Sequence, residues 1–160
     1  MTTALVTVAV AGTLVAACSS SGSTAASSPD PAFAQKGNAI CSRYNDTLGP
    51  LGAKAALSFQ SGDTAAAISA VDQEAELLGR EVDELDALHG TDSQETNLGK
   101  ALDLTRHQVE LAKQIADALR KNDLDAAGKA VDQSNGLNAP ADAAFRAAGL
   151  DGCTLESHTG

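Results

Sequence analysis

Aromatic residues are scarce in this chain of 160 residues, which contains no Trp, one Tyr and three Phe. All four fall on the apolar periodicity of the predicted helices: Phe33, Tyr44, Phe59 and Phe145. Because they follow that periodicity, we interpret them as core residues and not as a platform on which bases or sugars stack.

Basic residues are outnumbered, with 11 Lys and Arg against 21 Asp and Glu and a formal net charge of -10. Nucleic-acid binding depends on cationic neutralisation of phosphates, and electrostatic attachment to anionic lipid depends on the same attraction. The charge balance therefore argues against both, and we expect no nucleic-acid partner.

Catalytic motifs are missing as well, since the chain has no Gly-x-Ser-x-Gly, no glycine-rich phosphate loop and no His-Glu-x-x-His. Its many carboxylates are predicted to lie on exposed helix faces, where nothing would move their pKa values toward those of a working acid or base. We therefore expect a protein that is not an enzyme, with no catalytic residue and no cofactor.

One set of side chains has the spacing of metal ligands, because Asp103, His107 and Glu110 would share one helix face. That face is otherwise polar, so we predict that it is exposed and cannot enclose a metal. A second acidic set avoids the apolar positions, as expected of a solvated face: Asp72, Glu74, Glu76, Glu81, Asp83, Glu84 and Asp86. The alternative for this set is attraction of Ca²⁺ or a cationic partner, although it lacks the glycine-centred loop of a calcium site. No metal site is expected.

No apolar run reaches the roughly 20 residues that a membrane-spanning helix needs. The run over residues 4–17 instead suits the core of an export signal and ends at Cys18. Leu14-Val15-Ala16-Ala17-Cys18 resembles the lipobox of bacterial lipoproteins, which implies a Cys18 that carries acyl chains after cleavage. Export signals usually open with Lys or Arg, and residues 1–4 contain neither, so either translation begins upstream or the signal is weak. The alternative is a chance cysteine after a buried apolar segment.

This interpretation divides the chain into four parts: residues 1–17 as the lipoprotein signal peptide, 18–29 as a Ser-rich flexible tether, 30–153 as the helical bundle domain and 154–160 as a tail. The tether has no charge and no large apolar side chain, so it cannot offset the chain entropy of folding. The mature protein is then expected on the exported face of the cell membrane, attached through acyl chains on Cys18.

Apolar residues recur at steps of three and four over four segments, which predicts four helices. Asp30-Pro31 opens the first, Asp63 caps the second, the third covers about 93–121 and the fourth about 124–148. We expect an all-α fold, an up-down four-helix bundle. Other expected core residues include Ile40, Leu48, Leu51, Ile68, Val71, Val82, Leu85, Leu102, Leu111, Leu124, Val131 and Leu137.

Prolines are expected to disturb two of these helices. Gly49-Pro50 should kink or interrupt the first helix, and Pro140 the fourth, where Asn138 would cap a second short helix.

An internal similarity links the two halves of the domain. Residues 62–73 (GDTAAAISAVDQ) and 122–133 (NDLDAAGKAVDQ) share seven of 12 positions at an offset of 60. This similarity favours two similar helical hairpins packed as a bundle. The alternative is that both segments are simply common starts of Ala-rich helices.

Two further cysteines, Cys41 and Cys153, would remain in the mature chain. In an up-down bundle, the start of the first helix and the end of the fourth lie at the same end, and an oxidising compartment favours pairing. We predict a disulfide between them, the alternative being two separate buried thiols.

The whole pattern resembles small uncharacterised helical lipoproteins of actinobacteria. The resemblance rests on the lipobox, the Ser-rich tether, and the segments Ala39-Ile40-Cys41-Ser42-Arg43-Tyr44-Asn45 and Ala147-Ala148-Gly149-Leu150-Asp151-Gly152-Cys153. It implies a lipid-anchored, cysteine-bridged helical domain and no particular reaction. We interpret the protein as a non-catalytic interaction or structural module of the cell envelope, with an envelope protein as partner. The alternative is a carrier of a small apolar ligand held between the helices. The oligomeric state stays open.

Overall fold

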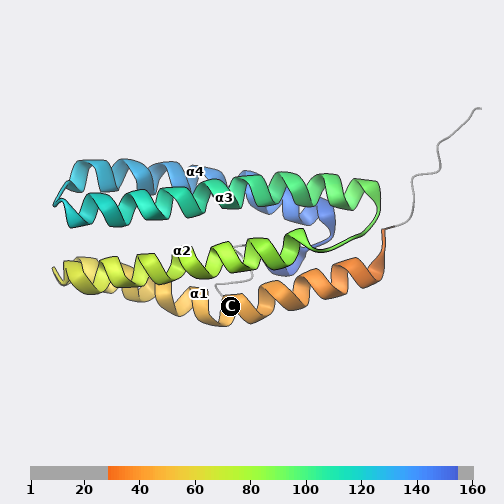
Figure 1. The fold of residues 1–160 in the computed structure, drawn as a ribbon, viewed down its shortest axis with the longest axis horizontal. Coiled ribbons are helices and arrows are strands. Elements are labelled where there is room, and N and C mark those ends of the chain that lie inside the picture. The colour runs from red at the N-terminus through yellow and green to blue at the C-terminus, as the bar shows by residue number, and fades with distance from the viewer. Residues whose placement is uncertain (1–28, 155–160) are drawn as a thin grey trace, which may run out of the picture.

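A computed structural model describes residues 29–154 of the chain. This part folds into four long helices and one short 3₁₀ helix: α1 (Pro31–Gln60), α2 (Thr64–Asp86), α3 (Asp92–Arg120), α4 (Leu124–Ala148) and η1 (Asp151–Cys153). Figure 1 shows α1 and α2 as one hairpin and α3 and α4 as a second hairpin beside it. The predicted all-α four-helix bundle is confirmed.

The predicted signal peptide, Cys18, nearly all of the predicted tether, and residues 155–160 lie outside the described residues. Within residues 29–154, none of the helices combines the length and the apolar character needed to cross a bilayer.

Each long helix begins at a side chain that accepts a hydrogen bond from its first turn. Asp30, Asp63 and Asp123 accept from backbone amides two or three residues ahead. Thr91 forms a reciprocal capping box with Gln94 at the start of α3. Such caps satisfy amides that have no partner within the helix, and each contributes about 1 kcal/mol. The predicted starts at Asp30 and Asp63 are confirmed.

The two hairpins have the same connection, 60 residues apart. Gly62 and Asn122 both adopt left-handed backbone, with φ of 78° and 55°. The amide of Asp63 donates to the Ser58 carbonyl and that of Asp123 to the Ala118 carbonyl, both at 2.9 Å. The repeated sequence therefore marks repeated structure, which supports the interpretation of two similar hairpins.

Both internal prolines lie inside continuous helices. α1 passes through Pro50 and α4 through Pro140, so the predicted interruption at either residue, and the second short helix capped by Asn138, are wrong. Both prolines are exposed, so the carbonyl that each leaves without a helical partner can bind water instead. The kinks themselves stay a prediction.

The apolar core is divided into two clusters. The larger lies toward the end of the bundle that holds Cys41 and Cys153, and it includes Phe33, Leu102 and Leu150. The smaller contains Leu119 and Ala127 near the connection between α3 and α4. The middle of the bundle is therefore not filled by one continuous core.

Three residues predicted as core are exposed instead: Phe59 at 52%, Leu124 at 58% and Val131 at 40%. α1 packs on α2, α2 on α3 and α3 on α4, whereas the backbones of α1 and α4 stay apart along most of their length. These side chains lie on the apolar sides of their helices, but no neighbouring helix covers them.

Candidate functional site

The predicted cysteine pair comes together in the structure. The sulfurs of Cys41 and Cys153 lie 1.96 Å apart and their Cα atoms 5.0 Å apart, although 112 positions separate them in sequence. The residues around them are held by Asn38, whose Oδ1 accepts from the Gly152 amide at 2.7 Å. This pair joins the start of α1 to η1, which follows α4.

The face that carries Asp103, His107 and Glu110 is exposed, as predicted. Asp103 pairs with Arg106 at 3.1 Å, and Glu110 pairs with Lys113 at 2.8 Å. Across residues 29–154, the structure gathers no three His, Cys, Asp or Glu side chains into a group that could hold a metal ion.

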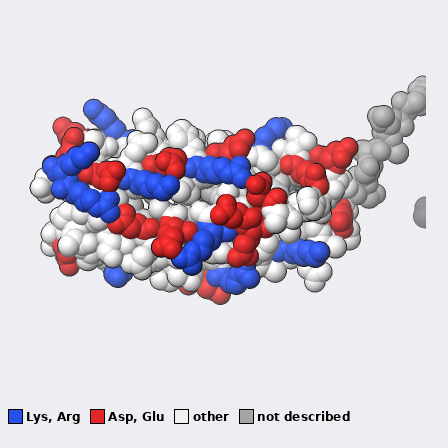
Figure 2. Space-filling view, in the orientation of Figure 1, with Lys and Arg blue, Asp and Glu red and all other residues white. Residues whose placement is uncertain are grey.

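Most of the acidic set of α2 is exposed, as predicted, and four of its members are paired with arginines. Asp72, Glu76, Glu84 and Asp86 form ion pairs with Arg120, Arg80, Arg43 and Arg106 respectively. On the face of the molecule in Figure 2, acidic and basic side chains alternate over the surface. The net negative charge therefore does not form a continuous acidic patch on that face.

Two members of the set are directed inward. Glu81 is only 7% exposed and Glu74 is half-buried, and both line a cavity inside the bundle. Burial first, and the charge of Glu84 second, raise the pKa of Glu81 to about 7. Burial also raises the pKa of Glu74. The prediction that every carboxylate of this set is solvated and keeps an ordinary pKa is wrong for these two residues.

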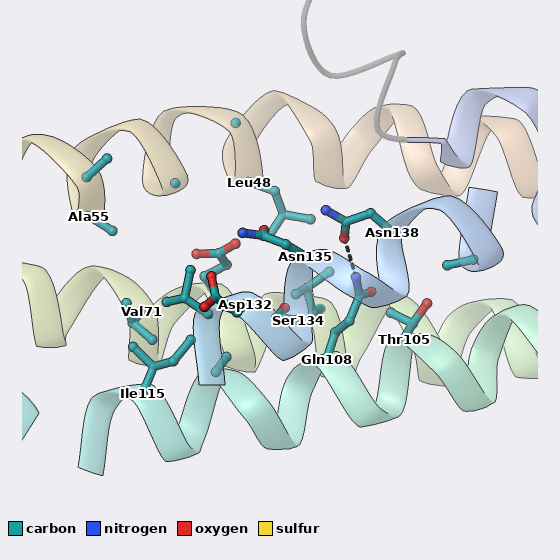
Figure 3. A pocket seen from close by; sticks show the side chains of 18 of the residues that line it. Leu48, Ala55, Val71, Thr105, Gln108, Ile115, Asp132, Ser134, Asn135 and Asn138 are labelled. Atoms are coloured by element: carbon teal, nitrogen blue, oxygen red, sulfur yellow. Dashed lines mark hydrogen bonds between the residues drawn. The ribbon is translucent and has the colours of Figure 1, made fainter. Parts of the chain in front are cut away.

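The cavity occupies the space between the two core clusters and measures about 900 Å³. All four helices contribute to its wall (Figure 3). Leu48 and Ala55 come from α1, Val71 from α2 and Ile115 from α3, so much of the wall is apolar.

Small residues make up part of the cavity wall on α1 and α4. The wall that α1 contributes includes Gly49, Gly52 and Ala55, and that of α4 includes Ala127 and Gly128. A Cβ atom added at Gly52 or Gly128 would meet nothing within 4 Å. The wall therefore has unfilled space at these two glycines.

One side of the cavity is polar, and α4 supplies most of it. Asp132, Ser134, Asn135 and Asn138 line this side in Figure 3. Nε2 of Gln108 on α3 donates to Oδ1 of Asn138 at 2.6 Å. An apolar wall with a few converging polar groups is the usual composition of a small-molecule site.

The charged residues that line the cavity are all acidic. Its acidic members are Glu74, Glu81, Asp132 and Asp142, and none of its members is Lys, Arg or His. Glu81 itself has no hydrogen bond or ion pair among the contacts of residues 29–154.

Sequence reasoning missed Glu74 and Glu81 as site residues, although a signal was present. Ala67, Glu74, Glu81 and Leu88 are spaced by seven, which places the two carboxylates along the edge of the apolar stripe of α2. The stripe of small residues at positions 49, 52 and 55 of α1 was the second signal.

No protein-family model, no curated protein and no solved structure matches this chain.

Proposed function

We propose that the protein is a lipid-anchored, extracytoplasmic carrier that holds a small, largely apolar ligand in the cavity between its helices. The cavity itself is the observation that carries this proposal. Its volume of about 900 Å³ falls within the range of roughly 300–1,000 Å³ that is typical of small-molecule sites.

The distribution of apolar side chains supports a carrier. Of the four large apolar residues that are most exposed in residues 29–154, three line the cavity: Phe59, Leu124 and Val131. A ligand that covers them would remove apolar surface from water, which contributes roughly 25 cal/mol for each Å².

The position of the cavity suits a tethered protein. The described chain enters the bundle at Asp30, at the end that holds Cys41 and Cys153 (Figure 1). Phe59 and Leu124 lie next to the connections at the opposite end. Acyl chains on Cys18 would therefore hold the domain by the end that is remote from these two residues.

The interaction module, with an envelope protein as partner, stays a prediction with less support. That function would use acidic helix faces, but four acidic residues of α2 are paired with arginines. Two more line the cavity. The geometry thus favours ligand binding over docking through an acidic face, and we propose no reaction.

Two glycine substitutions test the carrier. Gly52 and Gly99 are both half-buried helical glycines whose added Cβ would meet nothing within 4 Å, but only Gly52 lines the cavity. We expect Gly52→Phe to fill the cavity and to lower the affinity for Nile red, a neutral apolar fluorophore, by about tenfold or more. Gly99→Phe should leave the affinity unchanged.

The same variants can be studied in protein extracted from the membranes of its own cells. A native, non-reducing mass spectrum should begin at Cys18 with acyl chains, and it should include bound ligand that Gly52→Phe loses and Gly99→Phe keeps. A mass that begins at Met1 without lipid would exclude the anchor. Equal Nile red affinity in wild type and Gly52→Phe would exclude the carrier.

A further inference from the structure

The location of Glu81 restricts the ligand that the cavity could hold. Glu81 lies in the middle of α2, between Leu78 and Val82, which line the same cavity. Its side chain is more than nine-tenths buried and has no hydrogen bond or ion pair among the described contacts. An ionised carboxylate in such a place is unfavourable unless a positive charge or a set of donors is supplied.

The protein does not supply that charge from its cavity wall. The titratable groups that line the cavity are Glu74 and Glu81 on α2 and Asp132 and Asp142 on α4, and α1 and α3 contribute none. On α2 itself, Arg80 precedes Glu81 but pairs with Glu76. Glu84 lies one turn further along the helix, and its negative charge raises the pKa of Glu81. Glu84 in turn is occupied by Arg43 and by the hydroxyl of Tyr44, which donates to it at 2.6 Å.

A bare metal ion does not match the rest of the site. Apolar side chains such as Leu78, Val71 and Ile115 form much of the wall, and the described residues gather no three metal-ligating side chains. A cation that is attached to an apolar body would match both the carboxylate and the wall.

We propose that the ligand is an organic amine with one positive charge and an apolar body, and that Glu81 receives its ammonium group. The proposal rests on the proposed carrier function and specifies the class of its ligand. The apolar body would cover the exposed side chains of Phe59, Leu124 and Val131, while Gln108 and Asn138 offer further hydrogen-bonding groups.

The titration of Glu81 gives this arrangement a pH dependence. With a pKa of about 7, Glu81 loses its proton only as the pH rises through neutrality. The ammonium group binds the ionised form, so the affinity for an amine should rise with pH across this range and binding should release a proton. A neutral ligand with the same body should lack this rise.

Three probes with one alkyl chain test the proposal on the full chain: decylamine, decanol and decanoate, each measured by displacement of Nile red. At about pH 8 we expect decylamine to bind roughly tenfold to a hundredfold more tightly than decanol, and decanoate to bind most weakly. At about pH 5 the preference for decylamine over decanol should largely disappear, because Glu81 is then protonated.

Two substitutions of similar shape separate Glu81 from general charge effects. Glu81→Gln should abolish the preference for decylamine and leave decanol binding intact. Glu76→Gln, which removes an exposed carboxylate paired with Arg80, should change neither. The pH dependence of the wild type tests the same point without any substitution.

The outcomes are distinguishable from those of the carrier test. If all three probes displace Nile red equally, or if Glu81→Gln retains the preference for decylamine, the cavity is a carrier site for a neutral ligand and the amine proposal is overturned. If Nile red and all three probes fail to bind, the proposed carrier function is overturned together with it.

Discussion

Glu81 must be ionised to bind the proposed ammonium group, whereas its burial makes the folded state more stable when it is protonated. Its pKa of about 7 exceeds the value of 4.5 for an unperturbed Glu, and burial is the main cause. Between these two pH values the folded state holds a proton that the unfolded state has released. Stability from this group is therefore complete below about pH 4.5 and is lost as the pH rises through 7.

The Glu81→Gln substitution tests this statement. We expect wild type to lose on the order of 3 kcal/mol of unfolding free energy from this group between about pH 4.5 and pH 8. Glu81→Gln should lose less over the same range and should be the more stable protein at pH 8. Urea unfolding at the two pH values measures both quantities. If the unfolding free energies of wild type and Glu81→Gln change equally with pH, the raised pKa assigned to Glu81 is contradicted. Glu76→Gln, which removes an exposed carboxylate, is the control and should change with pH as wild type does.

At the residue scale, helical periodicity predicts burial correctly for side chains that a neighbouring helix covers. It predicts burial wrongly for apolar side chains that no helix covers. Phe33, Tyr44 and Phe145 are buried as their periodicity predicts. Phe59 and Val131 have the same periodicity and are exposed. Periodicity identifies the apolar side of a helix, but it gives no information about the distance to the next helix. It therefore could not predict the cavity.

At the scale of the elements, the connection between the helices of each hairpin depends on one residue with positive φ. Gly62 has a φ of 78° between α1 and α2, and a Cβ there is strained by about 1–2 kcal/mol. We expect Gly62→Ala to lower the unfolding free energy by about 1 kcal/mol. Chemical denaturation measures the change.

Gly79 offers the matched control, because it lies within the helical part of α2 and an added Cβ would meet nothing within 4 Å. Gly79→Ala should raise the unfolding free energy by roughly 0.5–1 kcal/mol, since it removes backbone entropy from the unfolded chain. If Gly62→Ala and Gly79→Ala both lower the unfolding free energy, the loss at Gly62 cannot be attributed to its positive φ.

Local signals predicted the starts of the helices well, because a capping side chain acts within one turn of helix. Asp30 and Asp63 begin helices as expected, and Gly149 ends α4 in left-handed backbone with a φ of 83°. The two prolines were overestimated as helix breakers: each removes one hydrogen bond, whereas the packing of a long helix supplies many contacts. The wide spacing between the backbones of α1 and α4 depends on how two helices pack together, so it cannot be predicted from either segment alone.

At the scale of the whole molecule, the disulfide acts on the side of the bundle that packing leaves open. α1 and α4 each contact η1, but their own backbones stay apart along most of their length. The Cys41–Cys153 bond joins α1 to η1 across a separation of 112 residues, so it limits how far α1 can move from α4. We therefore expect the Cys41–Cys153 bond to affect both the shape of the cavity and the stability of the fold.

Replacement of both cysteines by alanine tests the two effects together. We expect the double variant Cys41→Ala, Cys153→Ala to lose roughly 2–5 kcal/mol of unfolding free energy, because a long loop is released in the unfolded state. Its affinity for Nile red should also fall under conditions in which it is still folded, because α1 is then free to separate from α4. Dithiothreitol should reduce the stability of wild type toward that of the double variant and leave the double variant unchanged. If the double variant is less stable but binds Nile red as tightly as wild type, the bond stabilises the fold without shaping the cavity, and packing of α1 on α2 alone must define its wall.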